Sequence, residues 1–327
     1  MNQKSFFISW VAHSTRSDSL AHHLGAQSVH IHYFKPKQFK YLYAPLKYLL
    51  SGSKTLAVLS REKPDFVFVQ NPPIFCALTV WLWCLFSRAK LIIDSHTGAF
   101  DQPRWKAFHW LFRFLARRAA LTIVHNDPLT QIVTNWGAAA ITIGDIPFHL
   151  ETDFTYPFRD GFNVVYVCTF SPDEPVDAVI AAAKALPEIN FYVTGNLKYA
   201  AADIHERVPT NMTLTGFIPH KEYVALIKGC DVIMSLTTRN NTMQNGAYEA
   251  MEVGVPIITS NWPVLRQTFT IGTIHVDNTA KELIDAIEKM QKEHLRYVEE
   301  VRLLREERLK VWQENFSSML QILGVNQ

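Results

Sequence analysis

The sequence predicts an α/β protein of two doubly wound domains, and three observations support this fold class. Short apolar runs recur along the whole chain and alternate with longer stretches that have helical spacing. Most of these runs are continuously apolar, which is typical of parallel strands buried on both faces. The alternation occurs in both halves of a chain of 327 residues, which is long enough for two domains that each have a core.

Six strands are expected in each half. In the first half they are residues 5–10, 29–34, 65–70, 90–94, 120–125 and 140–143. In the second half they are residues 163–168, 190–194, 212–215, 231–235, 255–260 and 273–276. The longest apolar run, residues 74–86, is too short to cross a bilayer and predicts a buried helix.

The domain boundary is expected near residue 150. Residues 146–157 are rich in turn-forming and aromatic residues, which favours a linker. Beyond residue 279 the chain is charged and strongly helical through residue 323. We therefore predict a first domain at 1–150, a second domain at 151–300 and a C-terminal helix within 301–327.

Composition excludes some functions and indicates a compartment. The net charge is only +2, so electrostatics do not indicate a nucleic-acid partner. The four cysteines lie in apolar runs without Cys-x-x-Cys spacing, which favours buried thiols in a reducing compartment. Residues 6–12 are apolar but short and polar at Ser9, so we expect a first strand there and not a secretory signal. A cytoplasmic protein is expected.

The stretch from residue 242 to residue 260 carries the clearest functional signal. A polar loop leads into a short helix, Gly254 ends this helix, and a buried strand follows. The N-terminus of a helix offers backbone N–H groups and a partial positive charge, so it suits a phosphate group. Glu249 lies about one turn inside the helix, where its carboxylate can accept hydrogen bonds from sugar hydroxyls. Together these features indicate a nucleotide-sugar site.

The same stretch resembles the donor-binding segment of the GT-B glycosyltransferases of family 4, in which a Glu-Ala-Met-x-x-Gly-x-Pro run follows the phosphate-binding loop. Here the run extends from Glu249 to Pro256. The resemblance covers nearly the whole chain and is strongest from residue 164 to residue 269. It implies two Rossmann-like domains that face each other across a cleft, with the acceptor on the first and the donor on the second. It also implies that the last helix crosses back to the first domain, anchored by Trp312 and Phe316.

Residues 167–183 resemble the Val-Gly-Arg-Leu-Ser-x-x-Lys-Gly segment of the family, whose Arg and Lys hold the donor phosphates. Here Thr169 takes the place of the Arg and Glu174 that of the Lys, so the cationic clamp is missing from its usual place. The residues from Thr169 to Glu174 are more similar to those of the mannosyltransferase that extends dolichol-linked chitobiose. The alternative is a plain turn between a strand and a helix, with Asp173 and Glu174 as a solvated acidic edge.

Two glycine turns follow predicted strands in the order of the family. Gly195 comes after residues 190–194, as in the Gly-x-Gly turn of the family, and Gly216 precedes Phe217 and Ile218, as in its Gly-Phe/Tyr-Val-Pro turn. The resemblance implies that backbone groups at the second turn contact the nucleotide base. Either glycine alone is weak evidence, because glycines after strands are common in α/β proteins.

The family also places a first Glu eight positions before the second, and here that position is Asn241. The resemblance therefore assigns the ribose to Glu249 and leaves the donor sugar to the polar loop that contains Asn241. Thr242 and the backbone amides of Asn245 and Gly246 are expected to hold phosphate.

Arg239 is the candidate replacement for the missing phosphate cation, because a guanidinium group binds phosphate through two hydrogen bonds and stays charged. The alternative is an ordinary arginine of a surface loop.

The first half contributes two candidate catalytic residues. Arg16 follows the first strand, and His96 follows the strand at 90–94 in a segment that resembles the Asp-x-His of the family. His96 could contact the transferred group or the acceptor hydroxyl as an acid or base, and the alternative is a structural histidine. The sequence lacks Asp-x-Asp, the divalent-metal motif of the other main glycosyltransferase fold. We therefore expect no metal site and no cofactor.

Two basic and aromatic segments raise the possibility of membrane contact. Residues 35–50 mix lysines with tyrosines, as segments at a membrane surface do. Residues 105–118 are also basic and aromatic, but there a helix facing the core with a charged rim is the favoured interpretation. We expect the first segment to lie on a membrane beside a lipid-linked acceptor.

The expected function is transfer of a sugar from a UDP- or GDP-linked donor to a glycan or lipid-linked acceptor, in bacterial-type polysaccharide or glycoconjugate synthesis at the inner face of the membrane. Catalysis would come from positioning and from stabilisation of the leaving diphosphate. The resemblance implies retention of the anomeric configuration. Two alternatives stay open: a sugar-nucleotide epimerase of the same fold, and a non-catalytic nucleotide-sugar-binding subunit.

Overall fold

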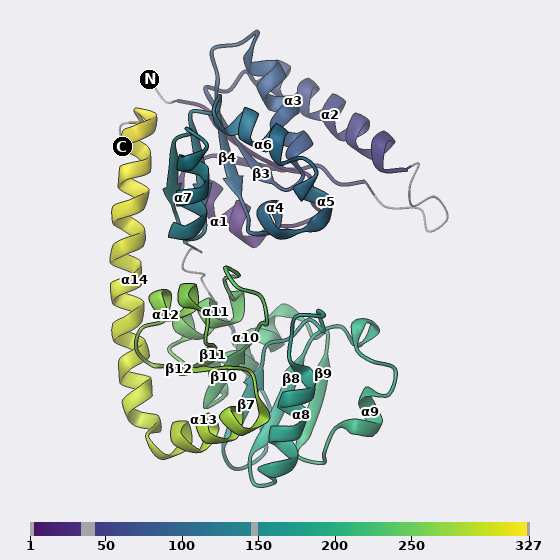
Figure 1. Ribbon diagram of the computed structural model, residues 1–327, viewed down its shortest axis with the longest axis vertical. Helices are drawn as coiled ribbons and strands as arrows, with labels where there is room; N and C mark the ends of the chain where they lie inside the picture. Colours follow the sequence, from purple (N-terminus) through teal and green to yellow (C-terminus); the bar gives the residue numbers. More distant parts are fainter. Residues whose placement is uncertain (1–2, 34–42, 145–149, 326–327) are drawn as a thin grey trace. The chain divides into compact units, whose positions relative to one another are not determined.

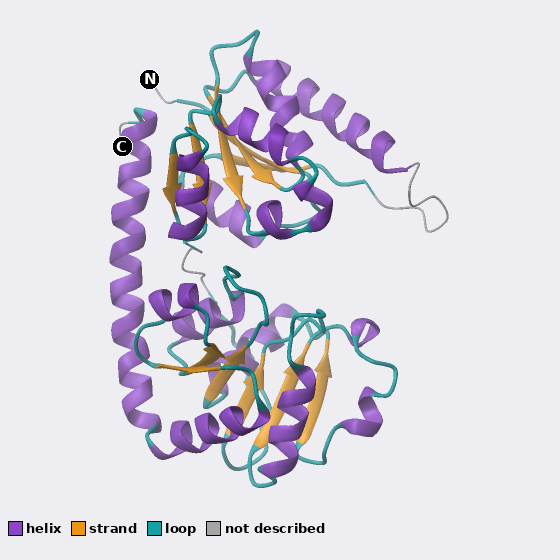
Figure 2. Cartoon of the chain, viewed as in Figure 1, coloured by secondary structure: helices purple, strands orange, loops and turns teal. Residues whose placement is uncertain are grey.

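The computed structural model describes residues 3–33, 43–144 and 150–325. The chain forms two compact units, one from Met1–Ile146 with Trp312–Gln327 and the other from Pro147–Val311 (Figure 1). Each unit has one six-stranded sheet with helices on both faces (Figure 2). All strand pairs of the described residues are parallel, as the continuously apolar strands predict.

The first sheet has the order β2-β1-β3-β4-β5-β6. Its strands are β1 (Ser5–Ser9), β2 (Gln27–His30), β3 (Phe66–Asn71), β4 (Lys90–Ser95), β5 (Leu121–Val124) and β6 (Ala140–Thr142). The helices of this unit are α1 (Thr15–His23), α2 (Tyr43–Glu62), α3 (Ile74–Cys84), α4 (Gly98–Asp101), α5 (Pro103–Lys106), α6 (His109–Ala116) and α7 (Asp127–Asn135).

The second sheet has the order β12-β11-β10-β7-β8-β9. Its strands are β7 (Asn163–Tyr166), β8 (Asn190–Thr194), β9 (Met212–Gly216), β10 (Val232–Ser235), β11 (Ile257–Ser260) and β12 (Thr273–Val276). The helical elements are α8 (Val176–Ala185), η1 (Leu197–Tyr199), α9 (Ile204–Arg207), α10 (His220–Gly229), α11 (Asn245–Val253), α12 (Pro263–Thr268), α13 (Ala280–Lys292) and α14 (His294–Leu323).

Each sheet separates two apolar clusters, because successive residues of a strand point to opposite faces. In β1, for example, Ile8 joins the cluster beneath α3 and α6, whereas Phe7 joins the cluster on the other face. Trp312 and Phe316 of α14 belong to that second cluster, and their rings are stacked with centroids 4.8 Å apart. The end of α14 is therefore part of the core of the first unit.

All twelve predicted strands are present, and their ends differ from the expected bounds by a few residues. The largest difference concerns residues 29–34, where β2 ends at His30. The reason is that its partner β1 ends at Ser9, which pairs with His30 in the register of the sheet. Residue 34, residues 35–42 of the expected membrane segment and residues 146–149 of the expected linker lie outside the described residues. Residues 150–162 run as an irregular segment.

The expected buried helix at 74–86 needs a correction. Ile74, Cys76, Ala77 and Val80 are buried in α3, but Leu82, Leu85 and Phe86 are exposed at its C-terminal end, Phe86 by 92%. An apolar run alone does not distinguish a core-facing side from a side that faces outward. Within the described ranges, no helix combines the length and the apolar character that a membrane span needs.

Candidate functional site

The second sheet has a topological switch point between β7 and β10, where the strand order reverses. Two loops leave this point from the carboxyl ends of the strands, residues 167–175 after β7 and residues 236–244 after β10. In open α/β sheets, ligands bind outside the carboxyl ends of the strands at such a point. The donor-binding candidates Thr169, Asn241 and Thr242 all lie on these two loops.

Glu174 shapes the first of these loops. Its carboxylate accepts hydrogen bonds from the backbone N–H of Thr169 at 3.0 Å and of Ser171 at 2.7 Å, and from the Thr169 hydroxyl at 3.1 Å. Two backbone N–H groups of this turn, which could otherwise bind a ligand, thus donate hydrogen bonds to a carboxylate of the same chain. Glu174 therefore holds the loop and is not a solvated edge.

Asp173 joins the two loops. Its carboxylate accepts a hydrogen bond from the Thr237 hydroxyl at 2.8 Å and forms an ion pair with Arg239 at 3.1 Å. The Thr238 backbone N–H donates to the carbonyl of Asp173 at 2.8 Å. The guanidinium group of Arg239 is therefore held beside the switch point, although half of its side chain is exposed.

Helix α11 begins at Asn245, next to the switch point. Gln244 precedes it, and its side chain does not cap the helix but accepts a hydrogen bond from the Ser235 hydroxyl at 3.2 Å. Gly246 packs against both strand ends, since a Cβ atom there would lie 2.8 Å from Val167 Cβ and from Ser235 Oγ. Only glycine lets the positive end of α11 come this close to the sheet.

A pocket of about 490 Å³ lies beside the switch point at the carboxyl ends of β7, β8 and β9. It brings together four of the predicted donor-binding residues, Thr169, Gly195, Phe217 and Ile218. Gly195 has φ +116°, and a Cβ atom there would lie 2.5 Å from the Cys168 carbonyl oxygen. The remaining lining residues are Val167, Cys168, Thr194, Asn196, Tyr199, Gly216, His220 and Tyr223.

Glu249 is connected to this pocket through Tyr223. The Tyr223 hydroxyl of α10 donates a hydrogen bond to Glu249 Oε2 on α11. Burial and the neighbouring carboxylate raise the pKa of Tyr223 well above its usual value, so the hydroxyl stays protonated and keeps donating. This contact fixes the carboxylate of Glu249 at the edge of the site.

The first unit contains a buried ion pair at the carboxyl end of β4. The side chains of Arg16 and Asp94 are 6% and 0% exposed, and Arg16 Nη2 lies 3.0 Å from Asp94 Oδ1. Arg16 also donates to the carbonyls of Ile143 and Gly144, at 2.9 and 3.0 Å. Burial acts to raise the pKa of Asp94, but Arg16, His96 and His125 outweigh it and hold that pKa well below its usual range. The sequence makes Arg16 a candidate catalytic residue, and the structure buries its side chain against Asp94.

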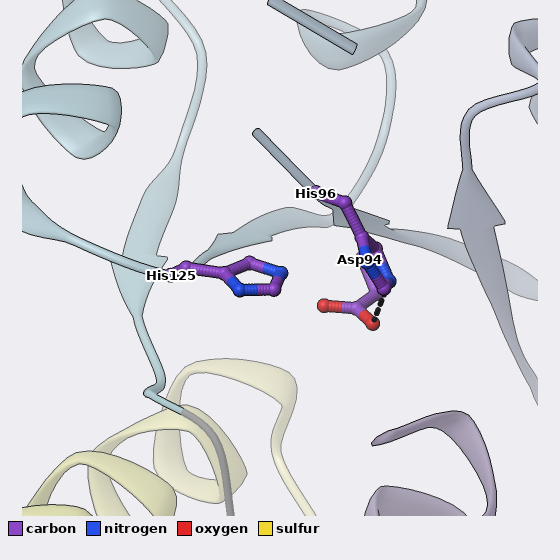
Figure 3. Close-up of side chains that lie close together, drawn as sticks. All are labelled: Asp94, His96 and His125. Atoms are coloured by element: carbon purple, nitrogen blue, oxygen red, sulfur yellow. Dashed lines mark ion pairs between the residues drawn. The ribbon is translucent and has the colours of Figure 1, made fainter. Parts of the chain in front are cut away.

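His96 and His125 lie beside the same carboxylate (Figure 3). His96 Nε2 is 3.6 Å from Asp94 Oδ2, and the two imidazole rings are 4.8 Å apart between centroids. One aspartate and two histidines could hold a metal ion such as Zn²⁺. However, the Arg16 guanidinium already neutralises the carboxylate that a metal would need. The arrangement places the His96 imidazole beside a buried carboxylate, at a distance longer than a hydrogen bond.

The structure thus gathers the candidates into three groups. Thr169, Gly195, Phe217 and Ile218 line one pocket. Arg239, Asn241, Thr242, Asn245 and Gly246 lie on the loop after β10 and the start of α11, with Glu249 one turn further along the helix. Arg16 and His96 meet at Asp94 in the other unit.

Sequence analysis missed Asp173, Tyr223 and His125 as contributors. The signal for His125 was available, because it directly follows the buried strand β5 just as His96 closely follows β4. Tyr223 and Asp173 act through partners on other elements, Glu249 and Arg239, and sequence spacing does not show such pairings.

Comparisons with known proteins identify two family matches. A model described as "Glycosyl transferases group 1" matches residues 161–293, and one described as "Glycosyl transferase 4-like domain" matches residues 10–145. A search of curated proteins found no match.

Solved structures share the whole fold. Sucrose-phosphate synthase from Thermosynechococcus elongatus has a TM-score of 0.73 at 13% identity, with 98% of each chain covered. Anabaena Alr3699/HepE in complex with UDP and glucose has a TM-score of 0.71 at 14% identity, over 98% of this chain and 100% of the other. The α,α-trehalose 6-phosphate synthase from Burkholderia multivorans has a TM-score of 0.70 at 12% identity, with 99% of each chain covered. The fold is therefore GT-B, as the resemblance implied.

Proposed function

Because this chain belongs to the glycosyltransferases, with a 4-like domain in its first part and a group 1 domain in its second, we propose that it transfers a hexosyl group from a nucleoside diphosphate sugar to a glycan or lipid-linked acceptor. The observation that carries the proposal is the convergence of the donor-binding candidates on the switch point of the second sheet, beside the pocket of about 490 Å³. The Anabaena structure with UDP and glucose supports a UDP donor, with GDP as the second choice.

In this proposal the pocket takes the nucleoside. Gly195 lets the turn after β8 pack close to Cys168 at the wall of the pocket, and Phe217, which is largely exposed at the pocket, offers an aromatic face for the base. Glu249, oriented by Tyr223, accepts hydrogen bonds from the ribose hydroxyls.

The diphosphate then lies at the start of α11. The amides of Asn245 and Gly246 and the Thr242 hydroxyl donate to it, with the helix dipole adding positive charge. Arg239 supplies the cation by turning from Asp173 to the phosphate oxygens. Asn241, whose backbone is left-handed at φ +57°, shapes the loop around the donor sugar.

His96 is the proposed catalytic group of the first unit. It contacts the transferred sugar or the acceptor hydroxyl, Asp94 orients its ring, and Arg16 is a positioning residue that holds Asp94. No divalent metal is required in this scheme, because Arg239 and α11 meet the charge of the leaving diphosphate. Turnover that is unchanged by EDTA is the expected result.

The biological setting is also proposed. Polysaccharide or glycoconjugate synthesis at the cytoplasmic face of a membrane suits a transferase with a lipid-linked acceptor. The four free cysteines support a reducing compartment.

The first test is thermal unfolding with UDP, GDP, ADP and TDP for the wild type and for Glu249→Ala. A ligand at 100 times its Kd stabilises the native state by about 2.7 kcal/mol. We expect one nucleotide to raise the Tm of the wild type, and this shift to be lost in Glu249→Ala. Glu288→Ala, the same change on the exposed face of α13, is the matched control and should keep the full shift.

Other outcomes would favour other functions. Absence of a shift with all four nucleotides would refute the donor site. Nucleotide binding without turnover would favour a binding subunit, and turnover of the nucleotide sugar without an acceptor would favour an epimerase.

A further inference from the structure

Helix α2 exposes apolar as well as polar residues on its outer side. Its inner side buries Leu59 together with the small polar residues Ser51 and Thr55, and Thr55 accepts a hydrogen bond from the indole N–H of Trp10 at 3.0 Å. Its outer side exposes Leu46, Leu49 and Leu56, with Leu49 71% exposed. A helix that only covers a sheet shows charged residues on its outer face. The leucines of α2 therefore face outward for a reason other than core packing.

The neighbouring helices extend this apolar surface. Figure 1 shows α2 beside α3, and the rings of Tyr48 on α2 and Phe75 on α3 are 5.0 Å apart between centroids. Phe75 in turn contacts Phe108, which directly precedes α6. On α6, Trp110 is 68% exposed. Exposed large apolar side chains on three adjacent helices mark a contact surface.

The same three segments are strongly basic. Residues 43–62, 74–89 and 103–119 contain nine Lys or Arg residues and one acidic residue, Glu62 at the end of α2, although the whole chain has 32 basic and 30 acidic residues. Among the basic residues, Lys54 on α2 and Arg113 on α6 are exposed. The near-zero balance of the chain thus hides a strongly asymmetric distribution of charge.

This combination of charge and apolar side chains distinguishes between two binding partners, another protein and a lipid bilayer. A protein partner would favour a contact whose centre is depleted of charged residues. A bilayer with anionic headgroups attracts Lys and Arg, while Leu side chains enter its boundary and Trp lies at headgroup level. We propose that the outer face of α2, with the adjacent α3 and α6, docks on an anionic lipid bilayer. This contact does not depend on the proposed transfer reaction.

Flotation with vesicles tests the proposal. The full chain is mixed with vesicles of phosphatidylcholine alone or of phosphatidylcholine with phosphatidylglycerol. We expect binding to the anionic vesicles that weakens as salt rises. The variant Leu49→Gln/Leu50→Gln should bind about tenfold more weakly, because both exposed side chains lose apolar contact. Lys54→Glu/Arg113→Glu should bind more weakly by a similar factor.

Control variants carry changes of the same kind in the other unit. These are Leu295→Gln and Lys184→Glu/Lys228→Glu, all at exposed positions of helices. Both should bind like the wild type.

Three outcomes would overturn the proposal: no binding to anionic vesicles by the wild type, equal binding by the α2 variant, or a shift from dimer to monomer that these variants cause in solution. The last outcome would identify a protein interface. The nucleotide-induced Tm shift of each variant shows separately that it is folded and that its donor site is intact.

Discussion

Replacement of Asp94 gives the sharpest test of the structure of the first unit. The carboxylate is fully buried and contacts Arg16 through both Nε and Nη2, at 3.2 and 3.0 Å. In Asp94→Asn the side chain keeps one acceptor but loses the negative charge opposite a buried guanidinium group. Breaking a buried pair in this way costs about 3–5 kcal/mol. For a unit of this size, 1 kcal/mol corresponds to about 2–4 °C in Tm, so a decrease of roughly 6–20 °C is expected.

Thermal unfolding followed by circular dichroism measures this effect, with two further variants to interpret it. Asp177→Asn removes a carboxylate from a surface pair with Arg207, in which Asp177 is 81% exposed, and should leave the Tm unchanged. Arg16→Met/Asp94→Leu replaces the whole pair by apolar groups and should recover much of the loss. A Tm of Asp94→Asn equal to that of the wild type would refute the buried pair.

The same residue predicts how stability depends on pH. Burial acts to raise the pKa of Asp94, but the lowering by Arg16 and the two histidines is larger. The folded-state pKa therefore lies below the unfolded value of about 4. The stabilisation is therefore complete above pH about 4 and is lost as the pH falls toward the folded-state pKa, because the unfolded state then binds more protons. The wild type should lose more stability than Asp94→Asn over this acidic range. Parallel curves for the two proteins would contradict this account.

Three changes and one control probe the donor site. Gly246→Ala places a methyl group 2.8 Å from Val167 and Ser235, so we expect a loss of about 1–3 kcal/mol together with weaker nucleotide binding. Gly254→Ala, in open space at φ +75°, should cost about 1 kcal/mol and leave binding unchanged; equal binding by both variants would argue against the close approach of α11. Glu174→Gln keeps the shape of the loop after β7 but loses its charge-assisted hydrogen bonds, so a loss of about 1.5–3 kcal/mol in urea unfolding is expected, and unchanged stability would exclude that role. Tyr223→Phe removes the donor to Glu249 and should raise the Kd for the preferred nucleotide about tenfold by calorimetry, with little change in Tm without ligand. An unchanged Kd would show that Glu249 is oriented without Tyr223.

Much of the fold could be predicted because its signals are local. A strand buried on both faces is mostly apolar, so runs such as residues 231–235 and 255–260 mark β10 and β11, which are fully buried, to within two residues of their observed ends. Errors occur where the end of a strand depends on its partner, as at β2, which stops where β1 stops. A second error is the exposed end of α3, because an apolar run does not show which of its sides other elements cover.

The candidate site likewise contains residues that the sequence shows and contacts that it does not show. Residues fixed by backbone geometry or by position after a strand, such as Gly195, Gly246 and His96, are visible in the sequence. Contacts between elements are not, because they join residues that are distant along the chain. The pairing of Asp173 with Arg239 and that of Arg16 with Asp94 are of this kind.

The sequence by itself determined the two α/β units, the positions of their strands and the polar loops at their carboxyl ends, since hydrophobic periodicity and glycine placement act over a few residues. Only the tertiary structure decided the strand orders that create the switch point, the burial of Arg16 against Asp94, and the outward leucines of α2. The physical reason is that burial and charge pairing depend on which elements become neighbours. The sequence of α2 does not show that Leu49 is exposed and Ser51 is buried, because this depends on the surface against which the helix packs.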